Sequence, residues 1–178
     1  NIGIIGLGNR LSDVIQYVLR LGEGEVRLSA VADLKPADEL KKNHPILKDV
    51  LETVRFYNDY EEMLDKEDLD GVMIGTRCSL HARIAKSVIN RGIPMFLEKP
   101  IATTWADFQM LRDVYKKLNG KTVVSFPLRL TRLVRQAKDI IDSGETGRIE
   151  HVSAFNYVTY GGVYFHGWYR DFEETQGL

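Results

Sequence analysis

Short apolar runs alternate with amphipathic segments along most of the chain, and Gly, Pro or Asn residues separate them. Runs that are apolar at nearly every position indicate strands buried on both faces of a parallel sheet, and apolar residues three or four apart indicate helices. The pattern predicts six strands, at residues 2–7, 26–33, 54–57, 71–75, 93–97 and 121–126. Helices are predicted between them, among them segments 36–42, 59–64, 80–90 and 104–118.

This alternation of strands and helices is typical of the α/β class with a doubly wound parallel Rossmann sheet. After the sixth strand we expect a helix at 131–143 and then a strand at 148–158, where apolar and polar positions alternate. Alternation indicates a half-exposed, antiparallel strand, which cannot form a stable sheet alone. We therefore expect a dinucleotide-binding domain at 1–127. At 128–178 we expect a connecting helix and the truncated beginning of an antiparallel α+β second domain.

The first strand runs directly into a turn that contains Gly6 and Gly8. Glycines allow a tight turn with the backbone close to a ligand, and the next helix would direct its N–H groups at phosphates. Asp33 ends the second strand, where a carboxylate can accept hydrogen bonds from ribose hydroxyls. This order of elements predicts a dinucleotide site, with an ordinary β-turn-α unit as the alternative.

Leu11 stands where the dinucleotide fingerprint has its third glycine. The usual close contact between helix and strand cannot form with this side chain, so we expect the helix to start later or to lie farther away. Ser12 and Asp13 are candidate N-caps, which would leave Asn9 and Arg10 beside the phosphates. Arg10 could then bind a phosphate or be a solvated turn residue, and the sequence favours neither.

The amino-acid composition indicates which kinds of binding partner to expect. The chain has 24 Lys and Arg against 25 Asp and Glu, a formal net charge of -1, without the basic excess typical of nucleic-acid binding. Cys78 is the only cysteine, and no apolar run reaches membrane-spanning length. We expect a cytoplasmic protein with no nucleic-acid, membrane or metal partner. Because the chain starts inside a strand without Met, we expect its native N-terminus to lie upstream.

In an open parallel sheet, ligands bind beyond the carboxyl ends of the strands. Those ends lead into residues 6–10, Asp33, 76–81 and 98–100. Lys99 is the strongest catalytic candidate, because an amine beside a nicotinamide can exchange a proton with a substrate hydroxyl. Glu98 could orient that ammonium or contact the cofactor. The alternative is that Glu98 and Lys99 form an exposed ion pair in a solvated loop.

Several motifs together resemble the Gfo/Idh/MocA oxidoreductases. They are Gly-Ile-Ile-Gly-Leu-Gly at 3–8, Asp33, Tyr-Asn-Asp-Tyr at 57–60, Asp-Gly-Val at 70–72, segment 76–81, Glu-Lys-Pro at 98–100 and Gly-Glu-Thr-Gly at 144–147. The resemblance covers nearly the whole chain. It implies a nicotinamide-dependent dehydrogenase or reductase that acts on a sugar, cyclitol or related polyol. It also implies a homo-oligomer formed through the sheet of the second domain. Asp33 predicts NAD rather than NADP as the cofactor, because its carboxylate would repel a 2′-phosphate.

The resemblance implies that Gly6 and Gly8 face the pyrophosphate, Asp33 the adenosine ribose, and Thr76, Leu80 and His81 the nicotinamide half. The predicted cofactor-binding set also includes further residues at the strand ends, namely Leu7, Asn9, Arg10, Arg77, Glu98 and Lys99. Lys99 would also be the catalytic lysine. The family usually has Thr-Pro-Asn where this chain has Thr76-Arg77-Cys78. Taken alone, His81 reads more simply as a histidine at a helix N-terminus.

Candidate substrate residues lie later in the chain. Arg129 could help to close the cleft or lie on the surface, and His166, Trp168 and Arg170 offer ring faces and donors for a sugar. Alternatively, the aromatic residues of this tail pack an interface. The family's acid/base pair, an Asp and a His on a second-domain helix, would lie beyond residue 178. We therefore expect these 178 residues to bind cofactor without turning over substrate.

Two other functions stay open at this point. Relatives with the same Rossmann domain use tightly held NAD in redox-neutral sugar chemistry such as glycoside cleavage. A regulator that binds a nucleotide without catalysis could also keep the fold, although Lys99 argues against it.

Overall fold

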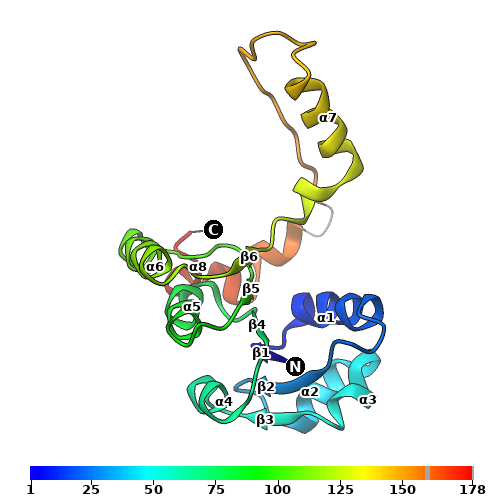
Figure 1. Ribbon diagram of the computed structural model, residues 1–178, viewed down its shortest axis with the longest axis vertical. Coiled ribbons are helices and arrows are strands. Elements are labelled where there is room, and N and C mark those ends of the chain that lie inside the picture. Colours follow the sequence, from blue (N-terminus) through cyan, green and yellow to red (C-terminus); the bar gives the residue numbers. More distant parts are fainter. Residues whose placement is uncertain (159–160, 178) are drawn as a thin grey trace.

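The computed structural model describes residues 1–158 and 161–177 of the chain. Six parallel strands form one sheet in the order β3-β2-β1-β4-β5-β6 (Figure 1). The strands are β1 (Ile2–Ile5), β2 (Leu28–Ala32), β3 (Arg55–Tyr57), β4 (Gly71–Ile74), β5 (Met95–Leu97) and β6 (Thr122–Val124). Each lies within a predicted range, so the doubly wound Rossmann sheet is confirmed.

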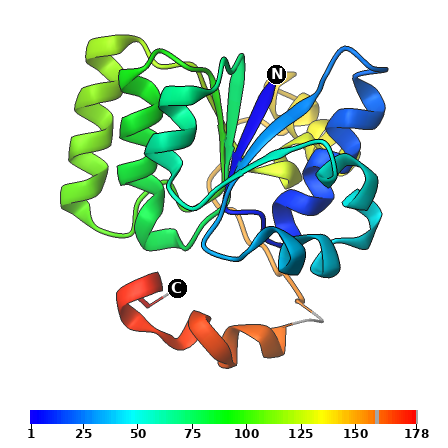
Figure 2. The same cartoon turned by 90° about the horizontal axis from the view of Figure 1, so that it is seen from below.

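Helices cover both faces of this sheet (Figure 2). One face carries α1 (Asn9–Leu21), α2 (Ala37–Asn43), η1 (Pro45–Leu47) and α3 (Lys48–Leu51). The other carries α4 (Tyr60–Lys66), η2 (Cys78–Leu80), α5 (His81–Asn90) and α6 (Trp105–Leu118). Side chains cap two of these helices, because Asp59 accepts a hydrogen bond from the Glu61 N–H at the start of α4 and Thr104 accepts one from the Asp107 N–H at the start of α6.

The strands divide their side chains between two apolar cores. In β1, Ile4 packs toward α1, whereas Ile5 packs toward α5, as the alternation of side chains along a strand requires. Ile5 pairs with Ile74 in the parallel register of β1 and β4, and the Gly75 N–H donates to the Ile5 carbonyl at 2.9 Å. The turns that follow β1 and β4 therefore leave the sheet side by side.

The segment after β6 leaves the body of the protein. It contains η3 (Pro127–Leu130) and α7 (Arg132–Asp142), and α7 projects away from the sheet (Figure 1). Leu133, Val134, Ile140 and Ile141 are all exposed on α7. This helix is therefore amphipathic, but its apolar side chains cover no part of the Rossmann core.

The strand expected at residues 148–158 is not present, which corrects the sequence prediction. These residues have no regular secondary structure and pair with no strand in the described part of the chain. Alternation of apolar and polar residues fixes only which face a side chain would occupy, and a strand also needs a neighbour for its N–H and C=O groups. The domain division at residues 127 and 128 stays a prediction.

The C-terminal tail returns to the carboxyl ends of the strands (Figure 2). It consists of η4 (Gly161–Phe165), η5 (Gly167–Arg170) and α8 (Phe172–Thr175). The Ser79 hydroxyl donates to Glu174 Oε2 at 2.6 Å, and the Arg77 guanidinium lies 4.2 Å from the centre of the Trp168 ring. The tail is thus docked on the turn that follows β4. No helix of the described residues is long and apolar enough to cross a membrane.

The apolar stripe of α7 generates a prediction for the 178-residue chain. Exposed apolar side chains gathered on one helix promote association, so we expect the chain to self-associate in light scattering. Leu133→Glu should weaken that association about tenfold or more, since losing one buried leucine contact costs about 2 kcal/mol. Gln136→Glu, an equal charge change on the same helix, should leave it unchanged. A chain that is monomeric before substitution would contradict this prediction.

Candidate functional site

The two glycines of the turn after β1 have different roles. Gly6 has a φ of 81°, and a Cβ at this position would lie 2.8 Å from the Thr76 backbone nitrogen. Both observations make a side chain at Gly6 incompatible with the fold. A Cβ at Gly8, in contrast, would meet no described atom within 4 Å. Gly6 therefore shapes the turn, and Gly8 leaves open space above its backbone where a ligand can approach closely.

The peptide groups of Leu7, between these glycines, are held from two sides. The Leu7 N–H donates to Asp33 Oδ2 at 2.8 Å, and the Leu7 carbonyl lies 2.9 Å from Nε2 of the buried His44 ring. Because a carbonyl can only accept, His44 Nε2 must carry the proton in this contact. Asp33 and His44 thus hold the turn on both sides, and nothing in the sequence pattern singled out His44.

The Asp33 carboxylate can accept further hydrogen bonds. Its Oδ1 accepts from the Lys35 N–H at 2.9 Å, so each carboxylate oxygen has one backbone partner. An ionised carboxylate offers about four acceptor positions, which leaves two for ribose hydroxyls. The position of Asp33 beside the glycine turn is therefore compatible with the predicted ribose contact, and the carboxylate also shapes the turn.

The helix α1 begins at Asn9 with Gly8 as its N-cap, and no side chain caps it. The expected N-cap at Ser12 or Asp13 is wrong, since both lie inside the helix. Its first turn contains no acidic residue, so no carboxylate of that turn offsets the positive end of the helix dipole. Together with the open space at Gly8, this arrangement suits an anionic group such as a pyrophosphate.

Leu11 replaces the third fingerprint glycine without delaying the helix. Its side chain is fully buried, and a Cβ at Gly75 would lie 2.5 Å from Leu11 Cγ. The small residue that permits this contact is therefore at the end of β4 instead of in α1. In the usual fingerprint the small residue is on the helix, whereas here the helix carries the large Leu11 and the small Gly75 follows β4. Only the structure reveals this exchange.

Arg10 connects the first turn of α1 to the ends of β5 and β6. Its Nε donates to Glu98 Oε1 at 3.0 Å, and its Nη2 donates to Ser125 Oγ at 3.3 Å. Arg10 thus pairs with side chains of the protein, although about half of its own side chain is exposed. Glu98 is buried and directs its carboxylate to Arg10, and no hydrogen bond or ion pair joins it to Lys99 within the described residues. The expected orientation of Lys99 by Glu98 is not observed.

The turns after β4 and β5 meet at His81. This buried ring lies between two carbonyl groups, with Nδ1 2.7 Å from the Pro100 oxygen and Nε2 3.2 Å from the Thr76 oxygen. The ring therefore positions both turns, a role that the sequence did not reveal. Leu80, half-buried beside it, packs against the core under α5.

Lys99 is exposed at the end of β5, directly after the buried Glu98. Burial raises the pKa of the Cys78 thiol, and the positive charge of Lys99 opposes that rise. Lys99 therefore lies within electrostatic range of the turn after β4. The structure places this amine at the same sheet edge as the glycine turn, which the sequence predicted from the strand ends.

The four candidate substrate residues are not gathered into one cluster. Arg129 stacks on Phe126 at 4.5 Å and is exposed in η3, and His166 and Arg170 are exposed in the tail. No hydrogen bond or ion pair joins these three residues to the strand ends within the described part of the chain. Only Trp168 reaches the turn after β4, through Arg77.

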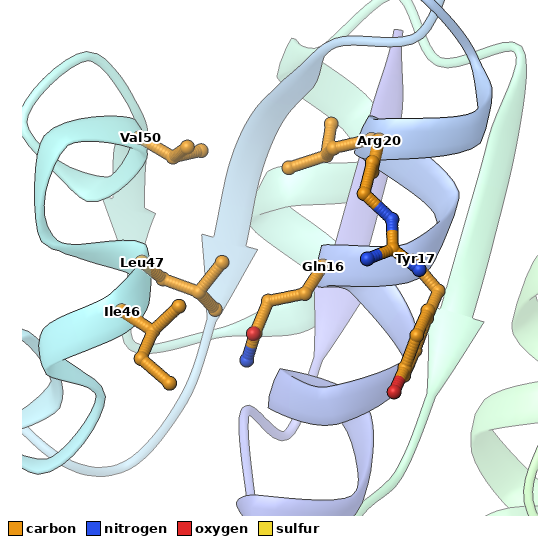
Figure 3. A pocket seen from close by; sticks show the side chains of 7 residues that line it. Gln16, Tyr17, Arg20, Ile46, Leu47 and Val50 are labelled. Atoms are coloured by element: carbon orange, nitrogen blue, oxygen red, sulfur yellow. The ribbon is translucent and has the colours of Figure 1, made fainter.

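A cavity of about 350 Å³ lies elsewhere, between α1 and the η1–α3 segment (Figure 3). Tyr17 and Arg20 from α1 face Ile46 and Leu47 across it, with the Arg20 guanidinium 4.9 Å from the Tyr17 ring centre. None of the predicted site residues lines this cavity. No group of three His, Cys, Asp or Glu side chains suited to a metal ion occurs among the described residues.

Comparisons with known proteins agree with this geometry. A family model described as an oxidoreductase family with an NAD-binding Rossmann fold matches residues 1–126. Inositol 2-dehydrogenase of Salmonella typhimurium strain LT2 is 33% identical over 148 residues, which are 82% of this chain and 42% of that protein. The chain therefore spans less than half the length of this relative.

Solved structures resemble the chain over a similar extent. Scyllo-inositol dehydrogenase from Lactobacillus casei, with bound NAD(H) and scyllo-inositol, superimposes with a TM-score of 0.69 at 28% identity. Myo-inositol 2-dehydrogenase from Lactobacillus plantarum superimposes with a TM-score of 0.71 at 26% identity. The similarity covers 83% of this chain in both cases and 42% of each solved chain.

The contact between Leu11 and Gly75 generates a prediction for stability. Gly75→Ala forces a methyl group against Leu11, so we expect it to lower the free energy of unfolding by about 1–3 kcal/mol. Gly71→Ala at the start of β4 is the matched control for Gly75 directly after that strand, because its Cβ would meet only the Pro94 oxygen at 3.6 Å. Urea unfolding of both variants measures the difference. Equal stability of the two variants would show that Gly75 is not needed for the packing of α1.

Proposed function

Because the chain belongs to the Gfo/Idh/MocA family of NAD-binding oxidoreductases, we propose that the whole protein is a dehydrogenase or reductase of polyols. It transfers hydride between NAD(H) and a sugar, a cyclitol or the corresponding ketone. The observation that supports this most directly is the shared sheet edge, where the clamped glycine turn and the exposed Lys99 both follow strand ends. The relatives named above are dehydrogenases, which favours neither the redox-neutral nor the regulatory alternative.

The residues at this edge fit a dinucleotide. Gly8 and the α1 N-terminus would hold the pyrophosphate, since the backbone there is open and its N–H groups point outward. Asp33 would accept hydrogen bonds from the adenosine ribose. Thr76 and Leu80 would border the nicotinamide, which supplies the hydride acceptor or donor when the cofactor is bound. Arg10 and Glu98 would support this site through their ion pair.

Lys99 performs the proton transfer in this proposal. In the oxidative direction its neutral amine accepts the proton of the substrate hydroxyl, while the hydrogen on the carbinol carbon leaves as hydride. In the reductive direction the ammonium returns that proton to the carbonyl oxygen. His81, whose ring nitrogens lie 2.7 Å from the Pro100 oxygen and 3.2 Å from the Thr76 oxygen, would position the turn that carries Lys99.

In the whole protein we propose a complete second domain. An Asp and a His of the second domain would complete the acid/base set, and its sheet would form a homo-oligomer. We also propose that the whole protein is cytoplasmic. The substrate itself would be bound between the strand ends and the second domain.

Cofactor selection gives one test. A 2′-phosphate would approach the Asp33 carboxylate, so we expect the full-length protein to prefer NAD over NADP by about tenfold or more, about 1.4 kcal/mol. Lys35 would attract a 2′-phosphate only weakly, because its ammonium already pairs with Glu39 at 2.7 Å. Titration of both cofactors measures the preference. Asp33→Asn, which keeps an acceptor for the Leu7 N–H, should reduce it; equal affinities in the parent would exclude the ribose role.

Mutant kinetics give a second test, of Lys99. Lys99→Ala removes the amine, and Lys99→Arg keeps the charge but cannot exchange a proton near neutral pH. Both variants of the full-length protein should lose about 10² to 10⁴ in kcat, the usual effect of a positioned acid or base, while cofactor affinity changes much less. Lys86→Ala, an exposed lysine of α5, is the control. Rescue of kcat by Lys99→Arg would instead assign Lys99 an electrostatic role.

A further inference from the structure

The Trp168 ring is covered on both faces. The Arg77 guanidinium carbon lies 4.2 Å from the ring centre, and the Tyr169 ring stacks on it with centres 4.0 Å apart and an interplanar angle of 26°. Two groups this close to one ring centre cannot occupy the same side, so they lie on opposite faces. No face of this indole is left for a sugar, which corrects the expectation that Trp168 offers one. Its role in the structure is to hold Arg77.

The contact with Trp168 leaves the N–H donors of Arg77 for other partners. The guanidinium carbon lies over the ring, and the ring offers no carboxylate or carbonyl oxygen to accept a hydrogen bond. The side chain is exposed, and no carboxylate pairs with it among the described residues. A guanidinium held beside a ring can bind a planar anion through two parallel hydrogen bonds.

The carboxylates of the same sheet edge have other partners. Glu174 accepts a hydrogen bond from Ser79 at 2.6 Å, and the buried Glu98 pairs with Arg10 at 3.0 Å. Neither is available to satisfy Arg77 without breaking a contact. The guanidinium therefore presents an unpaired positive charge to whatever occupies the edge.

Arg77 follows a strand that neighbours the one before the proposed proton-transfer group. β4 and β5 pair in parallel with Ile74 opposite Leu97, so the turns that carry Arg77 and Lys99 leave the sheet side by side. The His81 ring lies between the carbonyl groups of Thr76 and Pro100 and connects these two turns. A substrate whose hydroxyl meets Lys99 would therefore lie at the same sheet edge as the guanidinium of Arg77.

We propose that Arg77 is a specificity-determining residue that binds a carboxylate of the substrate, so that the protein acts on acidic sugars or polyols. This inference rests on the proposed oxidoreductase function and names its substrate class. A single guanidinium balances the one charge of a carboxylate, and its fork matches the two coplanar oxygens. Ser79 and Glu174 are positioning residues, because their hydrogen bond keeps the tail, and with it Trp168, against the turn after β4.

The test compares a pair of ligands that differ at one group. Glucuronate and glucose are titrated calorimetrically into the full-length protein saturated with NADH, and glucose 6-phosphate forms a third arm. We expect glucuronate to bind at least about tenfold more tightly than glucose, since one charge-assisted contact contributes on the order of 1.5–3 kcal/mol. Tight binding of glucose 6-phosphate in place of glucuronate would overturn the assignment to a carboxylate.

Two variants distinguish a loss of carboxylate binding from a loss of folding. Arg77→Gln removes the charge but keeps a long side chain against Trp168, and it should reduce the preference for glucuronate to within about threefold. Arg83→Ala, an exposed arginine of α5, is the matched control and should keep the full preference. Tryptophan fluorescence reports whether the tail stays docked. Equal weakening of glucuronate and glucose by Arg77→Gln, or no preference in the parent, would overturn the inference.

The binding measurement does not depend on turnover. A protein that binds glucuronate through Arg77 but forms no NADH from any polyol would contradict the proposed oxidoreductase function while the recognition role stands. A protein that oxidises neutral polyols and shows no measurable binding of glucuronate at millimolar concentration would contradict only the recognition role.

Discussion

The geometry of the sheet edge depends on how the peptide groups of Leu7 are held. Leu7 is buried, and a buried N–H or C=O without a partner costs about 1–3 kcal/mol. The Asp33 carboxylate binds the N–H and the His44 ring binds the carbonyl, so the turn after β1 is tied at two points to the connection between β2 and β3. With the turn fixed, Gly8 and the first turn of α1 face the open space where an anion can bind.

The strand order adds a second constraint. Successive strands are added on one side of β1 up to β3 and on its other side from β4 onward, so the strand order reverses between β1 and β4. Ligands of open α/β sheets bind at such a point. Gly6 meets Thr76 there, and Leu11 fills the space above Gly75. Arg10 crosses the same region to neutralise the buried Glu98, whose charge could not remain unpaired in the interior. The contacts that position the candidate site are thus concentrated at the reversal.

Two segments after β6 that carry exposed apolar side chains behave differently. The tail from η4 to α8 docks on the turn after β4, where Ser79 and Arg77 bind Glu174 and Trp168. The apolar residues of α7 project from the body and cover nothing in the described chain (Figure 1). Specific polar and aromatic contacts thus hold the tail against the Rossmann domain, and α7 makes no such contact within the described residues.

The sequence by itself determined the parallel sheet, the order of its elements and the residues at the strand ends. These features are local, because apolar periodicity, glycines and capping residues act within a few positions. Residues 148–158 show the limit, since their alternation defines two faces but supplies no neighbouring strand.

Only the tertiary structure decided how the strand-end residues are used. His44 meets Leu7 across 37 positions, Arg10 meets Glu98 across 88, and Ser79 meets Glu174 across 95. Gly75, which directly follows β4, provides the small residue that the fingerprint normally has in the first helix. Such contacts follow from how whole elements are placed in space, which periodicity along the chain does not encode.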